Sequence, residues 1–227
     1  PRKMRKYSFY IYLLFIPLFN YSIYSQMFGQ EPTERISNYD VQHIKLEIEV
    51  DPETKTLSGT VYTSIVPIVN SFSEFEVDAV GMTIENVWLD PEGPMTINYD
   101  GNTKRKGYYY TDLKFGYDKK KIYVNLDKPY STKDTLHYVI KYKTTDPEKG
   151  LYFITPTPDF PNKHYEVWSQ GEGEDNRYWF PCYDYPNDKA TTEIMVTVSS
   201  RYNTISNGVL KNKFDKLNYT TWHWVND

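Results

Sequence analysis

The segment from Trp168 to Pro186 mixes acids, glycines and bulky aromatic residues and shows no strand or helix period. Gly171 and Gly173 flank Glu172, which leaves its carboxylate uncrowded and the backbone free to turn. Gln170 lies two residues before Glu172, so in an extended chain both side chains point the same way. A carboxylate beside an amide oxygen suits a cationic amine, because one supplies charge and the other accepts an N–H. The pair therefore predicts a binding site for an ammonium group.

The alternative is a solvated acidic loop in which Arg177 pairs with a neighbouring aspartate. On residue chemistry alone this alternative is favoured, since acidic side chains in loops are usually exposed without any function.

Other kinds of chemical site lack their motifs. A catalytic zinc site needs about three protein ligands and one open position, but the sequence has no H-E-x-x-H and its histidines are scattered. P-loop, G-x-G-x-x-G, G-x-S-x-G and EF-hand patterns are also absent. The single cysteine, Cys182, is interpreted as a small buried hydrophobic residue rather than a nucleophile. The absence of these motifs therefore predicts that this chain contains neither a catalytic residue nor a metal ligand.

Alternating apolar and polar residues predict the elements that must position Gln170 and Glu172. In the first of them Ile44, Leu46 and Ile48 alternate with charged residues, as in a half-buried antiparallel strand. Turn signals separate such segments at regular spacing, which is typical of an all-β sandwich. The predicted strands are His43–Val50, Leu57–Val66, Phe72–Val77, Met82–Leu89, Lys121–Leu126, Thr135–Tyr142 and Thr191–Ser199.

Composition agrees with a β protein and excludes several classes. The 227 residues include 23 tyrosines and only two alanines, which disfavours helix and favours strand. With 39% hydrophobic residues the chain is too apolar to be disordered. The 26 basic and 30 acidic residues give a formal charge of -4, so no nucleic-acid partner is expected.

Residues 1–25 have the pattern of a secretory signal peptide. A basic head is followed by an apolar run, interrupted by Pro17, that is too short for a spanning helix of about 20 residues. Cleavage after Ser25 would leave residues 26–38 as a flexible lead-in, and an uncleaved N-terminal anchor is the alternative. We therefore expect export to the periplasm, the cell surface or the extracellular space, with no membrane-spanning segment in the mature chain.

Several motifs resemble the N-terminal domain of the aminopeptidase N family of zinc metalloaminopeptidases, the gluzincins that include leukotriene A4 hydrolase. Members carry a Q-x-E or Q-x-Q element, then A-R, then F-P-C-x-D-x-P-x-x-K-A. Gln170-Gly171-Glu172 matches the first element, Asn176-Arg177 replaces Ala-Arg, and Phe180 to Ala190 matches the last closely. Tyr185 departs from the pattern, since Glu is common there.

The resemblance extends from about residue 39 to the end and also includes strand and turn motifs. These are Tyr39 to Ile44, Leu57 to Val61 and Ile205 to Gly208. It implies a saddle-shaped antiparallel β-sandwich over residues 39–227, truncated at its C-terminal end. In the family the catalytic domain follows, with G-x-M-E-N and H-E-x-x-H, and neither motif occurs here. We therefore expect zinc to be bound by the parent enzyme and not by this chain, which alone should be inactive.

The resemblance also assigns roles to residues. Glu172 is similar to the family's acid that binds the free α-amino group of a peptide, and Gln170 is similar to its neighbouring substrate contact. Arg177, Asp184 and Lys189 are interpreted as residues that hold the loop through ion pairs and hydrogen bonds. The remaining structural positions of the motif are Phe180, Pro181, Cys182 and Pro186.

Two functions follow as hypotheses. In the first, the chain belongs to an exported zinc metalloaminopeptidase that removes N-terminal amino acids from peptides, and it contacts the catalytic domain of the same polypeptide. In the second, it is a stand-alone β-sandwich that binds peptides or glycans through surface tyrosine and tryptophan residues without catalysis.

Overall fold

The computed structural model describes residues 35–91, 93 and 110–227. The expected signal peptide and most of the expected lead-in lie outside the described residues. Those two assignments therefore stay predictions. Residues Ser37–Asp227 form one compact unit. Within the described residues, no helix is both long and apolar enough to span a bilayer.

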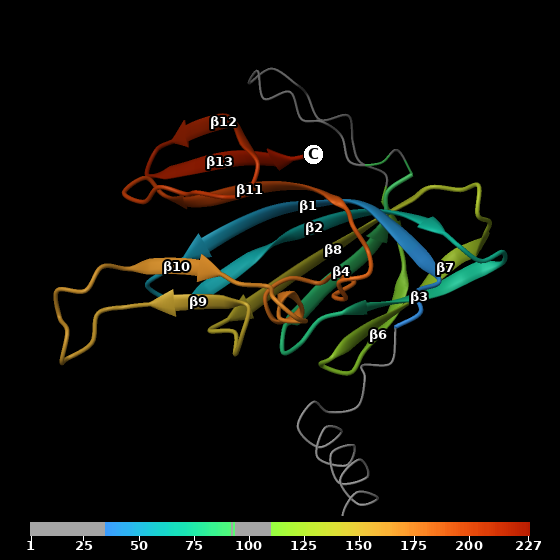
Figure 1. Ribbon diagram of the computed structural model, residues 1–227, viewed down its shortest axis with the longest axis horizontal. Helices are drawn as coiled ribbons and strands as arrows, with labels where there is room; N and C mark the ends of the chain where they lie inside the picture. Colours follow the sequence, from blue (N-terminus) through green and yellow to red (C-terminus); the bar gives the residue numbers. More distant parts are fainter. Residues whose placement is uncertain (1–34, 92, 94–109) are drawn as a thin grey trace, which may run out of the picture. The chain divides into compact units, whose positions relative to one another are not determined.

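Three β-sheets make up this unit (Figure 1). The largest has eight strands in the order β12-β13-β11-β1-β2-β8-β4-β5, the second has the order β3-β7-β6, and β10 and β9 form a separate pair. A single 3-10 turn, η1 at Asn176–Tyr178, is the only helical element in the described part. The strands are β1 Tyr39–Asp51, β2 Thr56–Pro67, β3 Phe72–Asp78, β4 Thr83–Leu89, β5 Thr111–Asp112, β6 Lys114–Tyr117, β7 Lys121–Tyr130, β8 Leu136–Thr145, β9 Leu151–Ile154, β10 Glu166–Ser169, β11 Thr191–Ser199, β12 Val209–Lys216 and β13 Tyr219–Asn226.

The hydrophobic core lies between the eight-stranded and three-stranded sheets. Val61 of β2, Ile140 of β8 and Ile122 of β7 are fully buried in one cluster. The ring of Phe75 in β3 packs on that of Tyr138 in β8, with centroids 4.9 Å apart. Two sheets packed face to face in this way form a sandwich. The all-β sandwich predicted from the sequence is therefore confirmed.

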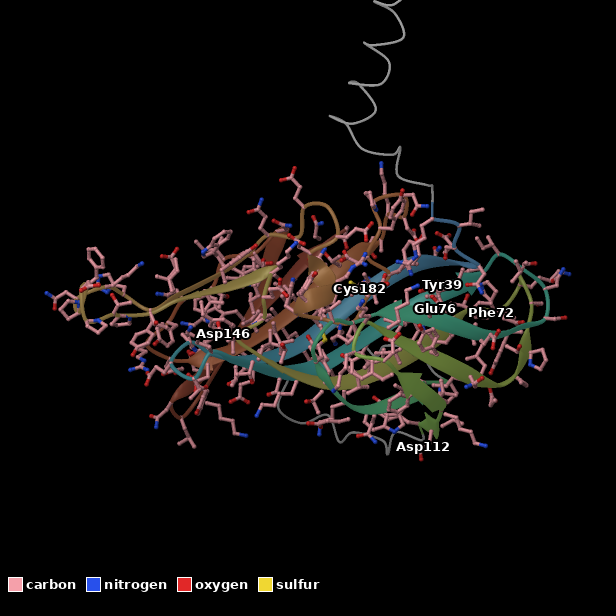
Figure 2. The ribbon with its side chains drawn as sticks, turned by 90° about the horizontal axis from the view of Figure 1, so that it is seen from below. Tyr39, Phe72, Glu76, Asp112, Asp146 and Cys182 are labelled. Carbon is pink, nitrogen blue, oxygen red and sulfur yellow. The ribbon has the colours of Figure 1, made fainter. Side chains whose placement is uncertain are left out.

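The start of β1 is fixed against the smaller sheet by an aromatic cluster. The Tyr39 hydroxyl donates a hydrogen bond to the carbonyl oxygen of Glu76, at 2.7 Å. Its ring meets the rings of Phe72 and Phe75 edge-on, with centroids 6.2 and 5.8 Å apart. Figure 2 shows Tyr39, Glu76 and Phe72 together at one end of the sandwich. Buried aromatic rings in edge-to-face contact stabilise the fold by more than the burial of their apolar surface alone.

One strand pair departs from the expected antiparallel arrangement. β11 runs parallel to β1, with His43 opposite Thr191 and Glu49 opposite Thr197. Parallel neighbours need a long connection, and the whole of β2 to η1 lies between these two strands. Alternation along a strand predicts which face is buried but not the direction of its neighbour, so the sequence pattern carried no signal for this pair.

Gly59 in β2 allows a close approach between β2 and β1. A β-carbon at this position would lie 2.4 Å from the carbonyl oxygen of Glu47 and 2.8 Å from Cγ2 of Ile48. Both atoms belong to β1, which cannot move away without breaking its pairing with β2. The resemblance to the family's opening hairpin includes this glycine, and the contact gives a physical reason for its presence.

We expect Gly59→Ala to lower the free energy of unfolding by about 1–3 kcal/mol, the usual cost of overpacking a filled site. Gly116→Ala in β6 is the matched control, because a β-carbon there would meet nothing within 4 Å. Urea denaturation of the two variants measures the difference. Equal stability of both variants would contradict the close approach of β1 and β2.

Candidate functional site

The turn that carries Gln170 and Glu172 begins where β10 ends. The backbone N–H of Gln170 donates to the carbonyl oxygen of Gly150 at 2.9 Å, which continues the β9–β10 pairing by one residue. The chain then turns at residues 172–175, with Gly173 at φ +78°. A β-carbon on Gly171 would lie 2.3 Å from the Asn176 side chain. The two glycines thus allow a tight turn immediately around Glu172.

The structure brings the two predicted binding residues together. The amide Nε2 of Gln170 donates to Oε2 of Glu172 at 3.4 Å, and both side chains are exposed. An amide carries an acceptor oxygen beside its donor nitrogen. The contact places an amide group beside the carboxylate, and the oxygens of the two side chains can accept from a cation with several N–H donors.

Glu172 lies at the rim of an open groove with a volume of about 470 Å³. Three carboxylates, those of Glu172, Asp184 and Asp188, are among its lining residues, and no Lys, Arg or His of the described part lines it. The groove also has aromatic walls from Phe180, Tyr183 and Tyr185. The Arg177 guanidinium offsets the charge of Asp184, so it is chiefly the exposed Glu172 carboxylate that can attract a cation to this concave surface.

Several hydrogen bonds join Arg177 to Asp184. The Arg177 backbone N–H and its Nε both donate to Oδ2 of Asp184 at 3.0 Å. The guanidinium also donates to the Asp184 carbonyl oxygen at 2.7 Å and pairs with Glu174. These contacts are of the kind expected for Arg177 and Asp184, and their role in holding the loop stays a prediction. Lys189 differs, because its side chain is exposed and forms no ion pair within the described residues.

Burial acts on the pKa of both groups, but it determines the net shift only for Asp184. Burial raises the pKa of the Asp184 carboxyl, while hydrogen bonds from Arg177 act in the other direction without overcoming it. Burial tends to lower the pKa of Arg177, but the hydrogen bond to Asp184 and the nearby charges of Asp78 and Glu174 outweigh it, so the net shift is upward. Removing the two charges from water costs free energy, which offsets much of the attraction between them. The main effect of the pair is therefore to fix the conformation of the loop, and its net contribution to folding stability is small.

Two further acids anchor the same segment, and sequence reasoning missed both. Asp78 accepts the backbone N–H of Asp184 through Oδ2 at 3.0 Å, and its own backbone exchanges two hydrogen bonds with Cys182. Asp188 accepts the backbone N–H of Val41 in β1 at 2.9 Å, and burial raises its pKa. For Asp78 a signal existed, because a carboxylate between Val77 and Ala79 breaks an apolar run.

The central part of the motif, Phe180 to Cys182, is packed into the interior. Trp179 and Phe180 are buried and meet edge-on with ring centroids 4.5 Å apart. Pro181 and Cys182 are buried, and the Cys182 thiol is free, which agrees with its interpretation as a small hydrophobic residue. Figure 2 shows Cys182 near the middle of the domain. Pro186 is exposed.

A scan against family models matches the Peptidase M1 N-terminal domain over residues 37–226. The chain belongs to this family. The match covers the whole sandwich described above, so the resemblance to the aminopeptidase N group seen in the motifs is confirmed.

Solved structures agree with the fold of this M1 domain. An M1 zinc metallopeptidase from Deinococcus radiodurans is 21% identical, with a TM-score of 0.64, over 83% of this chain and 39% of its own. A mutant of a two-domain M1 zinc metallopeptidase, bound to L-arginine, is 22% identical with a TM-score of 0.65, over 84% of this chain and 39% of its own. Identities this low show the shared fold.

Among curated proteins, Leucine aminopeptidase 2 of Aspergillus terreus is 27% identical over 166 residues, which is 71% of this chain. The chain spans 25% of that relative's length. Within the described residues, no group of three or more His, Cys, Asp or Glu side chains is placed to hold a metal ion. The described residues of this M1 domain therefore do not fit a zinc site.

Proposed function

We propose that this M1 N-terminal domain binds the free α-amino group of a peptide as part of a zinc aminopeptidase. Glu172 supplies the negative charge, and Gln170 supplies a second acceptor. The observation that carries the proposal is the contact of Gln170 with Glu172, whose carboxylate lines the groove. The motif from Phe180 to Ala190 and the family match support it.

The role of this domain is to orient the substrate. Holding the N-terminus at a fixed point determines which peptide bond reaches a catalytic centre, and such positioning contributes a large part of a rate enhancement. An amine anchor of this kind makes an enzyme an exopeptidase, because a blocked N-terminus carries no charge for Glu172 to bind. In this proposal the zinc ligands lie on a further domain of the same polypeptide, and the domain described here is inactive alone.

The complete reading frame that contains this chain tests the proposal. We expect it to hydrolyse leucine 4-nitroanilide and to leave the N-acetylated substrate uncut, and we expect a chelator to abolish hydrolysis until zinc is restored. Residues 37–227 expressed alone should hydrolyse neither substrate. Equal rates on the free and acetylated substrates, or no hydrolysis of either, would refute the proposal and favour a binding module.

A further inference from the structure

An aromatic pair on the β9–β10 hairpin faces away from the core. Trp168 and Tyr152 are direct cross-strand partners, with ring centroids 4.4 Å apart and planes 23° from parallel. The next pair along the hairpin, Val167 and Phe153, packs against the hydrophobic core. Because successive side chains in a strand point to opposite faces, Trp168 and Tyr152 lie on the outer face.

Trp168 keeps 41% of its surface exposed although one face of its ring is covered by Tyr152. A stacked aromatic pair is a known way to stabilise neighbouring strands. A two-stranded sheet is only marginally stable, so a structural role for the pair is the simplest explanation. Such a role does not by itself require the larger indole to remain open to solvent.

The position of Trp168 relative to Gln170 points to a further role. The hydrogen bond from Gln170 to Gly150 extends the strand pairing, so Trp168 and Gln170 lie on the same face, two residues apart. Two residues in a strand span about 6–7 Å. Gln170 in turn contacts Glu172. The exposed ring of Trp168 therefore lies beside Gln170, which in turn contacts Glu172, the proposed ligand of the amine.

We propose that Trp168, backed by Tyr152, determines specificity by accepting a large apolar or aromatic side chain from the N-terminal residue of the substrate. The inference rests on the proposed function, since the α-amino group must be held at Glu172 for that side chain to reach the indole. A flat ring face offers a large apolar contact area and stacks well on another ring. An alanine side chain is too short to use this surface.

The complete protein tests this with two substrates, phenylalanine and alanine 4-nitroanilide. We expect Trp168→Ala to reduce the Phe/Ala ratio of kcat/KM by about tenfold or more, as loss of an apolar contact does. The kcat/KM for the alanine substrate should change less than about twofold. Trp168→Phe, which keeps a ring, should restore most of the ratio.

Phe160→Ala is the matched control, because Phe160 is 68% exposed on the connection between β9 and β10 and lies away from Gln170. It should leave the ratio unchanged. If Trp168→Ala unfolds, as shown by circular dichroism, Trp168→Thr keeps a strand-forming residue and should show the same loss. An unchanged ratio, or an equal loss for both substrates, would overturn the inference and leave a structural pair.

The failure of this inference can be separated from the failure of the proposed function. If the wild-type protein hydrolyses both substrates and depends on Glu172, but the ratio does not respond to Trp168, only the specificity role is wrong. If the wild-type protein hydrolyses neither substrate, or if Glu172→Gln has no effect, the proposed role of Glu172 is wrong. The specificity role of Trp168, which depends on it, is then wrong as well.

Discussion

Glu172→Gln in the complete protein is expected to lower kcat/KM for aminoacyl 4-nitroanilides by about 10- to 150-fold. The substitution keeps the shape of the side chain and removes its charge. A hydrogen bond to a charged group contributes about 1.5–3 kcal/mol, and each 1.36 kcal/mol corresponds to a factor of ten in rate. Steady-state kinetics should show a raised KM and a lowered kcat, since the same contact binds and orients the substrate.

Glu174→Gln is the control for this experiment. Glu174 lies in the same turn, is exposed, and pairs with Arg177. Its substitution changes the net charge of the loop by the same amount as Glu172→Gln. We expect less than about a threefold change in kcat/KM, so comparable losses in both variants would show that general loop charge, and not the Glu172 carboxylate, matters.

Asp184→Ala is expected to destabilise the chain by about 2–4 kcal/mol. Asp184 is 4% exposed and accepts two N–H groups of Arg177, so its loss leaves buried donors and a partly buried charge without their acceptor. The cost stays below that of a fully buried pair because Arg177 is 19% exposed and still contacts Glu174. Urea denaturation measures the change.

The matched control is Glu85→Ala, which removes an acid from the exposed ion pair with Lys141. Exposed pairs contribute about 0–1 kcal/mol, so this variant should be nearly as stable as the wild type. If the two alanine variants lose the same stability, the Arg177–Asp184 pair does not anchor the turn.

The predicted strands follow from alternation of side chains. The predicted range Thr191–Ser199 has the bounds of β11. Each of the other predicted ranges lies within an observed strand or overlaps one with its start one residue early. The sequence signal was absent for β12, in which seven of eight residues are exposed, and for the four-residue strands β9 and β10. Short or polar strands form because neighbouring strands pair with them, and their own sequences carry little periodicity.

The site was predictable where the contacts are local. Gln170 and Glu172 are two residues apart, so the expectation of an extended chain already placed their side chains together, although Glu172 lies in a turn. The contacts that anchor the turn join residues far apart in the sequence, Asp78 with Asp184 and Asp188 with Val41. No spacing rule predicts such pairs, because they depend on how the sheets pack.

The position of a bound substrate amine distinguishes an amine-binding Glu172 from an exposed loop acid. A crystal structure of the complete protein with L-leucine bound should place the ammonium nitrogen about 2.7–3.2 Å from a carboxylate oxygen of Glu172. A second contact should join it to the amide oxygen of Gln170. An amino acid bound with its ammonium group away from the turn at residues 170–173 would contradict the account, and Glu172 would then be an exposed loop acid.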